Sequence, residues 1–174
     1  MILDLLKAAI LGSVQGLTEF LPVSSTGHLI LAQELLGVDE ERFGLAFDAS
    51  LHVGTLVALL VFFGTRWLTL ASGGLTALRR RSFVTPDERL AGLIVLGTVP
   101  VAVLGFLFED AIDGTLRSPV LVATMLIAFS AVFVVAEAIG KRARDLSQIG
   151  WVDALVVGIA QAIALVPGVS RSGA

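Results

Sequence analysis

Residues 12–27 read GSVQGLTEFLPVSSTG, and residues 158–173 read GIAQAIALVPGVSRSG. The two stretches align without a gap at a constant offset of 146 residues, from position 12 to position 158. Each copy has an apolar helical run with one Gln, then a Pro-containing break, then a Ser/Thr–Gly cluster of the kind that begins a helix. In an apolar chain this pattern predicts two broken helices, built as internal repeats around one polar site.

The composition places the chain in a membrane. It is 56% hydrophobic and 16% charged, whereas soluble domains carry roughly 25% charged residues. Three apolar runs, residues 45–63, 90–108 and 119–139, come close to the roughly 20 residues that a bilayer-spanning helix needs. We therefore expect an all-α polytopic membrane protein. The absence of cysteine excludes disulfides and thiol chemistry.

The two motif copies are too short to cross a bilayer. The first apolar run, residues 5–20, spans only about 24 Å, Pro22 interrupts it, and a second short helix over about 26–36 ends at Gly37. We interpret residues 5–36 as a re-entrant hairpin that enters and leaves on one side. Residues 151–166 repeat this pattern, with a break at Pro167-Gly168 and a helix expected to restart near Ser170.

Three crossings between the hairpins predict inverted-topology repeats whose breaks can meet near the middle of the membrane. The loops agree, because 37–44 and 109–118 are acidic whereas 64–89 and 140–149 are basic, and Lys and Arg collect on the cytoplasmic side. The first hairpin would then open outward and the second toward the cytoplasm. The loop 64–89 also carries a pattern typical of an interfacial helix.

This reading gives a single membrane domain over residues 1–174. Repeat one covers 1–139 and the start of repeat two covers 150–174. Because the second unit stops at Ala174, within its own hairpin, we expect a fragment of a longer chain whose C-terminal part is missing.

The first break carries candidate catalytic groups. Gly12, Gln15, Gly16 and Glu19 share one helix face. A charge at membrane depth costs about 2.5–3.5 kcal/mol, so Glu19 needs a partner or a function. The alternative is a water-accessible Glu19 that only caps the helix.

The hydroxyl cluster follows at Ser24, Ser25 and Thr26, with His28 one turn later. On its own the cluster is an ordinary helix cap. A hydroxyl beside an imidazole and a carboxylate is also the set that activates a nucleophile, so Ser25 and His28 both stay candidates.

The second break supplies the opposite charge. Arg171, with Ser170 and Ser172, can bind phosphate through the planar guanidinium and through the N–H groups of a helix start. The alternative is that Arg171 simply neutralises Glu19. Together the two breaks indicate a phosphoryl-transfer site at the membrane surface. Asp48 and His52 lie four residues apart on the first crossing and either line the same cavity or leave His52 bonded only to a backbone carbonyl.

These residues resemble a known family. The stretch QGLTEFLPVSSTGH, residues 15–28, resembles the first motif of bacterial undecaprenyl-diphosphate phosphatases, the bacitracin-resistance family, and PGVSRSG, residues 167–173, resembles the second. Residues 47–55 look like the intervening helix of the family. The resemblance covers the whole chain.

The resemblance implies an enzyme of the bacterial plasma membrane that hydrolyses undecaprenyl diphosphate to undecaprenyl phosphate and inorganic phosphate at the outer face, recycling the lipid carrier for cell-wall synthesis. It implies catalytic roles for Glu19, Ser25 and His28, with Ser25 and His28 as nucleophile or acid/base, and a phosphate-binding role for Arg171. From the residues themselves we expect Ser24, Thr26, Ser170 and Ser172 to bind phosphate beside Arg171. It also implies a required divalent metal, Mg²⁺ or Ca²⁺, tied to Gln15 and Glu19.

Two other functions stay open. Broken helices in inverted repeats are also transporter architecture, so the site could pass a phosphate-bearing or lipid substrate without cleaving it. A non-catalytic membrane subunit would tolerate substitution of Ser25 and Arg171. The expected partners are undecaprenyl diphosphate and the lipid bilayer, with no nucleic acid and with homo-oligomerisation open.

Overall fold

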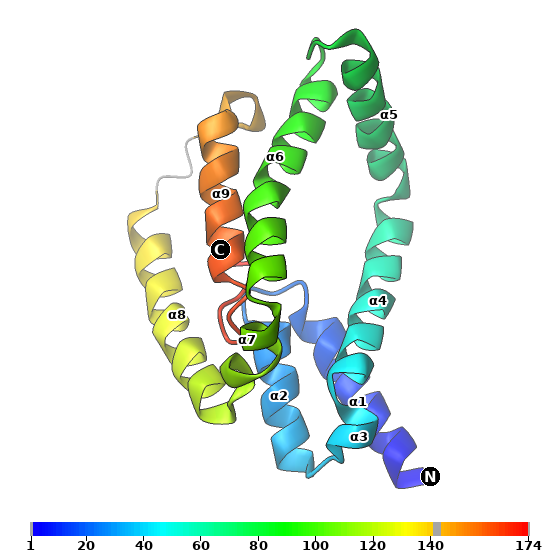
Figure 1. Cartoon of the computed structure of the whole chain (residues 1–174), viewed down its shortest axis with the longest axis vertical. Helices are drawn as coiled ribbons and strands as arrows, with labels where there is room; N and C mark the ends of the chain where they lie inside the picture. The colour runs from blue at the N-terminus through cyan, green and yellow to red at the C-terminus, as the bar shows by residue number, and fades with distance from the viewer. Residues whose placement is uncertain (1, 141–143, 174) are drawn as a thin grey trace.

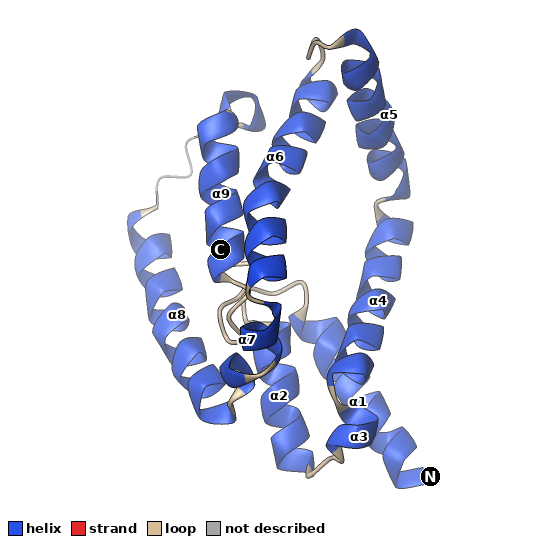
Figure 2. Ribbon diagram, in the orientation of Figure 1, coloured by secondary structure: helices blue, strands red, loops and turns tan. Residues whose placement is uncertain are grey.

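The computed structural model describes residues 2–140 and 144–173, and within them the regular structure is entirely helical (Figures 1 and 2). The elements are α1 (Ile2–Thr18), α2 (Ser25–Leu36), α3 (Glu40–Phe43), α4 (Leu45–Phe62), α5 (Gly64–Arg80), α6 (Pro86–Leu107), α7 (Glu109–Asp113), the 3₁₀ helix η1 (Thr115–Arg117), α8 (Pro119–Ile139), the 3₁₀ helix η2 (Leu146–Gln148) and α9 (Trp151–Ile163).

Three helical segments in the described part of the chain are long and apolar enough to cross a membrane: Glu41–Phe62, Pro86–Leu107 and Pro119–Ile139. They coincide with the three apolar runs that the sequence marks as crossings, and their passage across the bilayer stays a prediction. Helix α6 begins at Pro86 rather than near residue 90, because Thr85 and Glu88 form a capping box around its start. Pro86 fits the first turn, where its missing N–H costs nothing.

The first hairpin has the predicted break. Helix α1 ends at Thr18, α2 begins at Ser25, and the two helices pack against each other. Leu11, Leu29 and Phe43 form the buried core between them and α3. The hairpin closes at Gly37, whose left-handed conformation (φ 52°) ends α2.

Helix α9 forms the first arm of the second copy and packs closely along α6 (Figure 1). The approach is tight at Gly97 and Gly158, because a Cβ atom on Gly158 would overlap the carbonyl oxygen of Gly97. The helix expected to restart near Ser170 is not formed in the described residues. Instead the chain makes a turn there, closed by the Gly173 N–H on the Ser170 carbonyl at 3.2 Å.

The basic segment 64–89 does contain the predicted helix, α5. It follows α4 after the single residue Phe63, turns at Arg81 (φ 54°) and packs against α6 (Figure 1). The bonds of the Val84 and Thr85 N–H groups to Glu88 fix this turn at 2.6 and 3.1 Å. The interfacial position of α5 stays a prediction.

The acidic loops are less irregular than expected, since they contain α3, α7 and η1. Of the basic loop 140–149, Lys141 and Arg142 lie outside the described residues.

Candidate active site

The two breaks lie against each other, as the repeat predicts. A Cβ atom on Gly27 would stand 3.3 Å from the Cα of Gly168. Gly168 itself has φ 99°, and a side chain there would meet the Val122 carbonyl of α8 at 2.7 Å, so a glycine is required on both grounds. The Ser172 hydroxyl donates to the Leu21 carbonyl at 2.6 Å and joins the two breaks directly.

The backbone is strained at Ser24. Its φ of 64° is left-handed, a region that costs a residue with a side chain about 1–2 kcal/mol. The side chain compensates by accepting the Gly27 N–H at 3.3 Å, which caps α2. Ser24 therefore sets the direction in which Ser25 starts the new helix.

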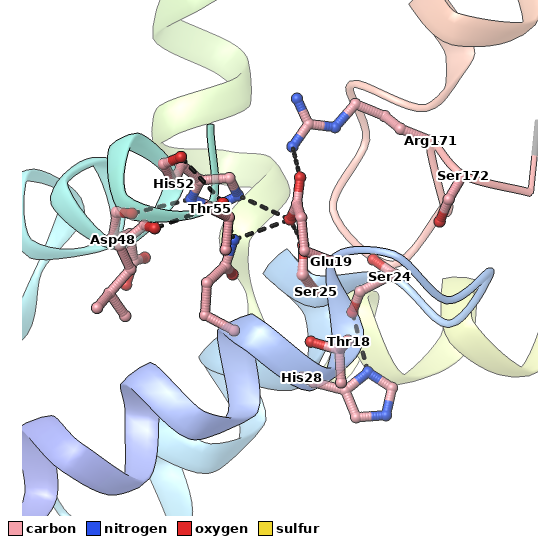
Figure 3. A network of polar contacts seen from close by, with 12 residues as sticks. Thr18, Glu19, Ser24, Ser25, His28, Asp48, His52, Thr55, Arg171 and Ser172 are labelled. Atoms are coloured by element: carbon pink, nitrogen blue, oxygen red, sulfur yellow. Dashed lines mark hydrogen bonds and ion pairs between the residues drawn. The ribbon is translucent and has the colours of Figure 1, made fainter. Parts of the chain in front are cut away.

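The Glu19 carboxylate is the centre of the site (Figure 3). Its Oε2 accepts the Ser25 hydroxyl at 2.5 Å and the Gln15 amide Nε2 at 2.8 Å. Its Oε1 faces Arg171, with the Nη2 atom at 3.8 Å. A carboxylate, a hydroxyl and a guanidinium from opposite ends of the sequence thus lie side by side.

Arg171 is held at its backbone, and its half-exposed guanidinium faces Glu19. Gln161, the counterpart of Gln15 in the second copy, donates to the Arg171 carbonyl at 2.7 Å. The side chain is 49% exposed, so its guanidinium is open to a ligand. The hydroxyl oxygens of Ser170 and Ser172 lie 3.1 Å apart beside it.

A cavity of about 170 Å³, called here the site cavity, joins these groups. Most of the residues predicted to act or to bind phosphate line it. Its polar walls are Glu19, Ser24, Ser25, Thr26, Arg117, Ser170, Arg171 and Ser172.

The sequence suggests that His28 lies beside Glu19, but in the structure His52 is the histidine nearer to that carboxylate. His28 does not line the site cavity. Its Nδ1 lies 2.9 Å from the Ser24 carbonyl and its ring points away from Glu19 (Figure 3). Neither Asp48 nor His52 lines the site cavity, but the His52 ring does more than bond a backbone carbonyl, because its Nδ1 lies 2.8 Å from the Asp48 carbonyl and its Nε2 3.7 Å from Glu19 Oε2. The imidazole beside the carboxylate therefore belongs to His52.

Sequence reasoning missed Arg117. This residue ends η1, and its Nη2 donates to Asp48 Oδ2 at 2.5 Å. Asp48 is 3% exposed, and its other oxygen accepts the Gln33 amide at 2.6 Å. The available signal was a single Arg in an acidic loop and a single Asp in an apolar helix. A buried carboxylate requires a partner of opposite charge, and this arginine could supply it.

The donor set around Glu19 suits a shared metal rather than a dedicated metal cage. In the described parts of the chain no three His, Asp or Glu residues are placed to hold an ion together. Gln15 is 1% exposed, and its Oε1 is buried without a hydrogen-bond partner. Mg²⁺ commonly takes one or two carboxylates and completes its shell with water and substrate phosphates, which fits Glu19, whereas Gln15 could join it only with its amide turned, because Nε2 rather than Oε1 faces Glu19.

Residues 8–174 match the family described as Bacitracin resistance protein BacA. The chain belongs to the BacA family. With its membrane-length helices, this BacA-family chain is a multi-pass protein of the bacterial membrane.

Relatives of the BacA-family chain carry the name undecaprenyl-diphosphatase. The protein from Rubrobacter xylanophilus is 52% identical over 173 residues, which are 99% of this chain and 64% of the relative. Those from Thioalkalivibrio sulfidiphilus and Desulforudis audaxviator are 46% and 44% identical, over 98% and 96% of this chain and 63% and 61% of theirs. The chain therefore spans less than two thirds of the length of these curated relatives.

Proposed function

We propose that the protein hydrolyses undecaprenyl diphosphate to undecaprenyl phosphate and inorganic phosphate at the outer face of the membrane, and so recycles a lipid carrier for cell-wall synthesis. The observation that carries this proposal is the convergence of Ser25, Glu19 and Arg171 in one cavity. The names of the relatives support it.

Phosphate binding falls to the second break. Arg171 presents a planar fork of N–H donors that matches phosphate oxygens. The hydroxyls of Ser170 and Ser172 line the same cavity, and Ser24 and Thr26 face them from the first break. The site can therefore hold a phosphate between the two copies.

Bond cleavage falls to the first break. The Ser25 hydroxyl already donates to Glu19, so the carboxylate can accept its proton as the oxygen attacks the terminal phosphorus. The bond between that phosphorus and the bridging oxygen breaks, and the lipid monophosphate leaves. The proton held by Glu19 passes to the leaving phosphate oxygen or to solvent, which restores the carboxylate. Glu19 then takes a proton from water as the water oxygen attacks phosphoserine, and returns that proton to the Ser25 oxygen as the bond between phosphorus and that oxygen breaks and inorganic phosphate leaves.

Gln15 and Glu19 are the residues that would hold a divalent metal, Mg²⁺ or Ca²⁺. When bound, the ion neutralises charge on the phosphate oxygens during transfer. Gln15 also orients the Glu19 carboxylate through its amide Nε2, a role independent of the metal.

An apolar cavity beside the site fits the lipid. It measures about 540 Å³ and shares Glu19, Arg171 and Ser172 with the site cavity. Its remaining walls are mainly apolar side chains of α4 and the first break: Phe20, Val53, Leu56 and Leu59, with His52 and Thr55. A prenyl chain lying there would place its diphosphate beside Arg171.

The proposed architecture is a pair of inverted repeats, with the first re-entrant hairpin open to the outside. The contact between the two breaks at Gly27 and Gly168 supports it, and so does the alternation of acidic and basic loops.

Single-cysteine labelling tests this topology on a background without native cysteine. We expect cysteines at Asp39 and Ile112 to react with an impermeant maleimide in intact cells, and a cysteine at Arg80 to react only after the membrane is opened. Labelling of positions 39 and 80 from the same side would contradict the inverted arrangement.

Phosphate release tests the activity. A natural full-length protein containing this sequence, purified in detergent, should release inorganic phosphate from undecaprenyl diphosphate, and Arg171→Lys should lose most of that rate although the charge is kept. Arg42→Lys, on the exposed face of α3, is the matched control. Uptake of a phosphate-bearing lipid into vesicles without phosphate release would favour the transporter alternative.

A further inference from the structure

Arg117 lies between two cavities. It lines the site cavity together with residues of both breaks. It also lines a larger cavity of about 700 Å³, formed by the acidic segments 37–44 and 109–118 together with the ends of α2 and α8. The side chain is 20% exposed, so it is largely buried but still accessible to a ligand.

Asp48 fixes the Arg117 guanidinium. The carboxylate is 5% exposed and contacts Nη2 at 2.5 Å. Gln33 holds the second oxygen of the carboxylate and also donates to the Phe43 carbonyl at 2.8 Å. The pair therefore ties α2, α4 and η1 together.

The pair with Asp48 does not use up the arginine. A guanidinium has five N–H donors, and the described residues engage one nitrogen, Nη2, through Asp48. The remaining donors suit an oxyanion, since arginine binds phosphate through several parallel N–H bonds.

A diphosphate offers a second anionic group to a second arginine. It carries negative charge on both phosphorus groups, and Arg171 can engage one of them while facing Glu19. The apolar cavity places the lipid end beside Arg171 and Ser172. The phosphate farther from the lipid then extends into the site cavity, whose lining includes Arg117.

We propose that Arg117, held by Asp48, is a second phosphate-binding residue that engages the terminal phosphate of a diphosphate and gives the site its preference for diphosphate over monophosphate. This inference rests on the proposed function.

Competition by two simple anions tests the inference in the natural full-length protein. Inorganic pyrophosphate and inorganic phosphate are titrated as inhibitors of turnover and, independently, as stabilisers against thermal unfolding. Arg117→Gln should raise the pyrophosphate concentration needed for either effect by about tenfold or more, the size of one charge-assisted contact, with a much smaller change for phosphate. Arg117→Lys should restore part of the difference.

Arg42→Gln is the matched control, because Arg42 also pairs with a carboxylate, Asp4 at 2.9 Å, but on the exposed surface. Arg42→Gln should leave unchanged the concentrations of pyrophosphate and of phosphate needed for inhibition or stabilisation. Equal changes for pyrophosphate and phosphate in Arg117→Gln, or no change in either, would overturn the inference. If that variant does not fold, Arg117→Lys and Asp48→Asn serve in its place. The ratio between the effective concentrations of pyrophosphate and phosphate is compared with that of the wild type in the same way.

The binding measurement separates this inference from the proposed function. If wild-type protein releases no phosphate from undecaprenyl diphosphate but its stabilisation by pyrophosphate still depends on Arg117, the second phosphate-binding residue stands and the hydrolysis does not. If hydrolysis is robust and the effective concentration of pyrophosphate is the same with and without Arg117, the proposed hydrolysis stands and this inference fails.

Discussion

Replacing Glu19 with glutamine is expected to lower kcat by about two to four orders of magnitude, the usual contribution of a general base. Glutamine keeps the shape and can still contact Gln15 and Ser25, but it cannot take the Ser25 proton. It also removes the charge that faces Arg171 at 3.8 Å and the carboxylate that would hold the metal.

The measurement is phosphate release from undecaprenyl diphosphate over a Mg²⁺ titration. We expect Glu19→Gln to lose kcat at every Mg²⁺ concentration and to need more of the ion. Glu41→Gln, an exposed carboxylate on α3, is the control and should behave as wild type. A Glu19→Gln variant with near-normal kcat would remove Glu19 from the chemistry.

Replacing Ser25 with alanine is expected to lower kcat about a thousandfold or more, because the attacking oxygen is lost. Ser25 and Glu19 act as one unit, so the Ser25→Ala, Glu19→Gln double variant should be little worse than either single variant. His28→Ala should cost far less, because the His28 ring is held at the Ser24 carbonyl and does not line the site cavity.

The decisive measurement is a denaturing quench during turnover, followed by mass spectrometry of the peptide that contains residue 25. Wild type should carry phosphoserine there, and Ser25→Ala should not. Ser13→Ala is the control, since that exposed hydroxyl bonds only within α1, to the Ala9 carbonyl at 2.8 Å. Near-normal turnover in Ser25→Ala, with loss in His28→Ala, would reverse the assignment.

The fold was largely predictable because its signals are local. Length and hydropathy are enough to mark α4, α6 and α8, and Pro119 even fixes the first residue of α8. The break between α1 and α2 follows from Pro22 and the capping serines. The restart at Ser170 could not be judged in the same way, since a helix start depends on residues that follow it.

The site was predictable only in part, because side-chain direction depends on tertiary context. Sequence spacing placed His28 one turn after Ser25, but the left-handed backbone at Ser24 begins α2 so that His28 points away. His52 and Arg117 reach the site from α4 and η1 through packing that no local pattern encodes. The convergence of the breaks was predictable because the repeat itself implied it.

The constant offset between the two copies has a consequence for how a substrate is oriented. Position 25 of the first copy corresponds to position 171 of the second, and one holds a serine while the other holds an arginine. A site built from equivalent backbone segments would by itself accept a ligand in either sense. Unlike side chains at matching positions give it a polarity, so a diphosphate that enters backwards would present its bridging oxygen to the wrong partner.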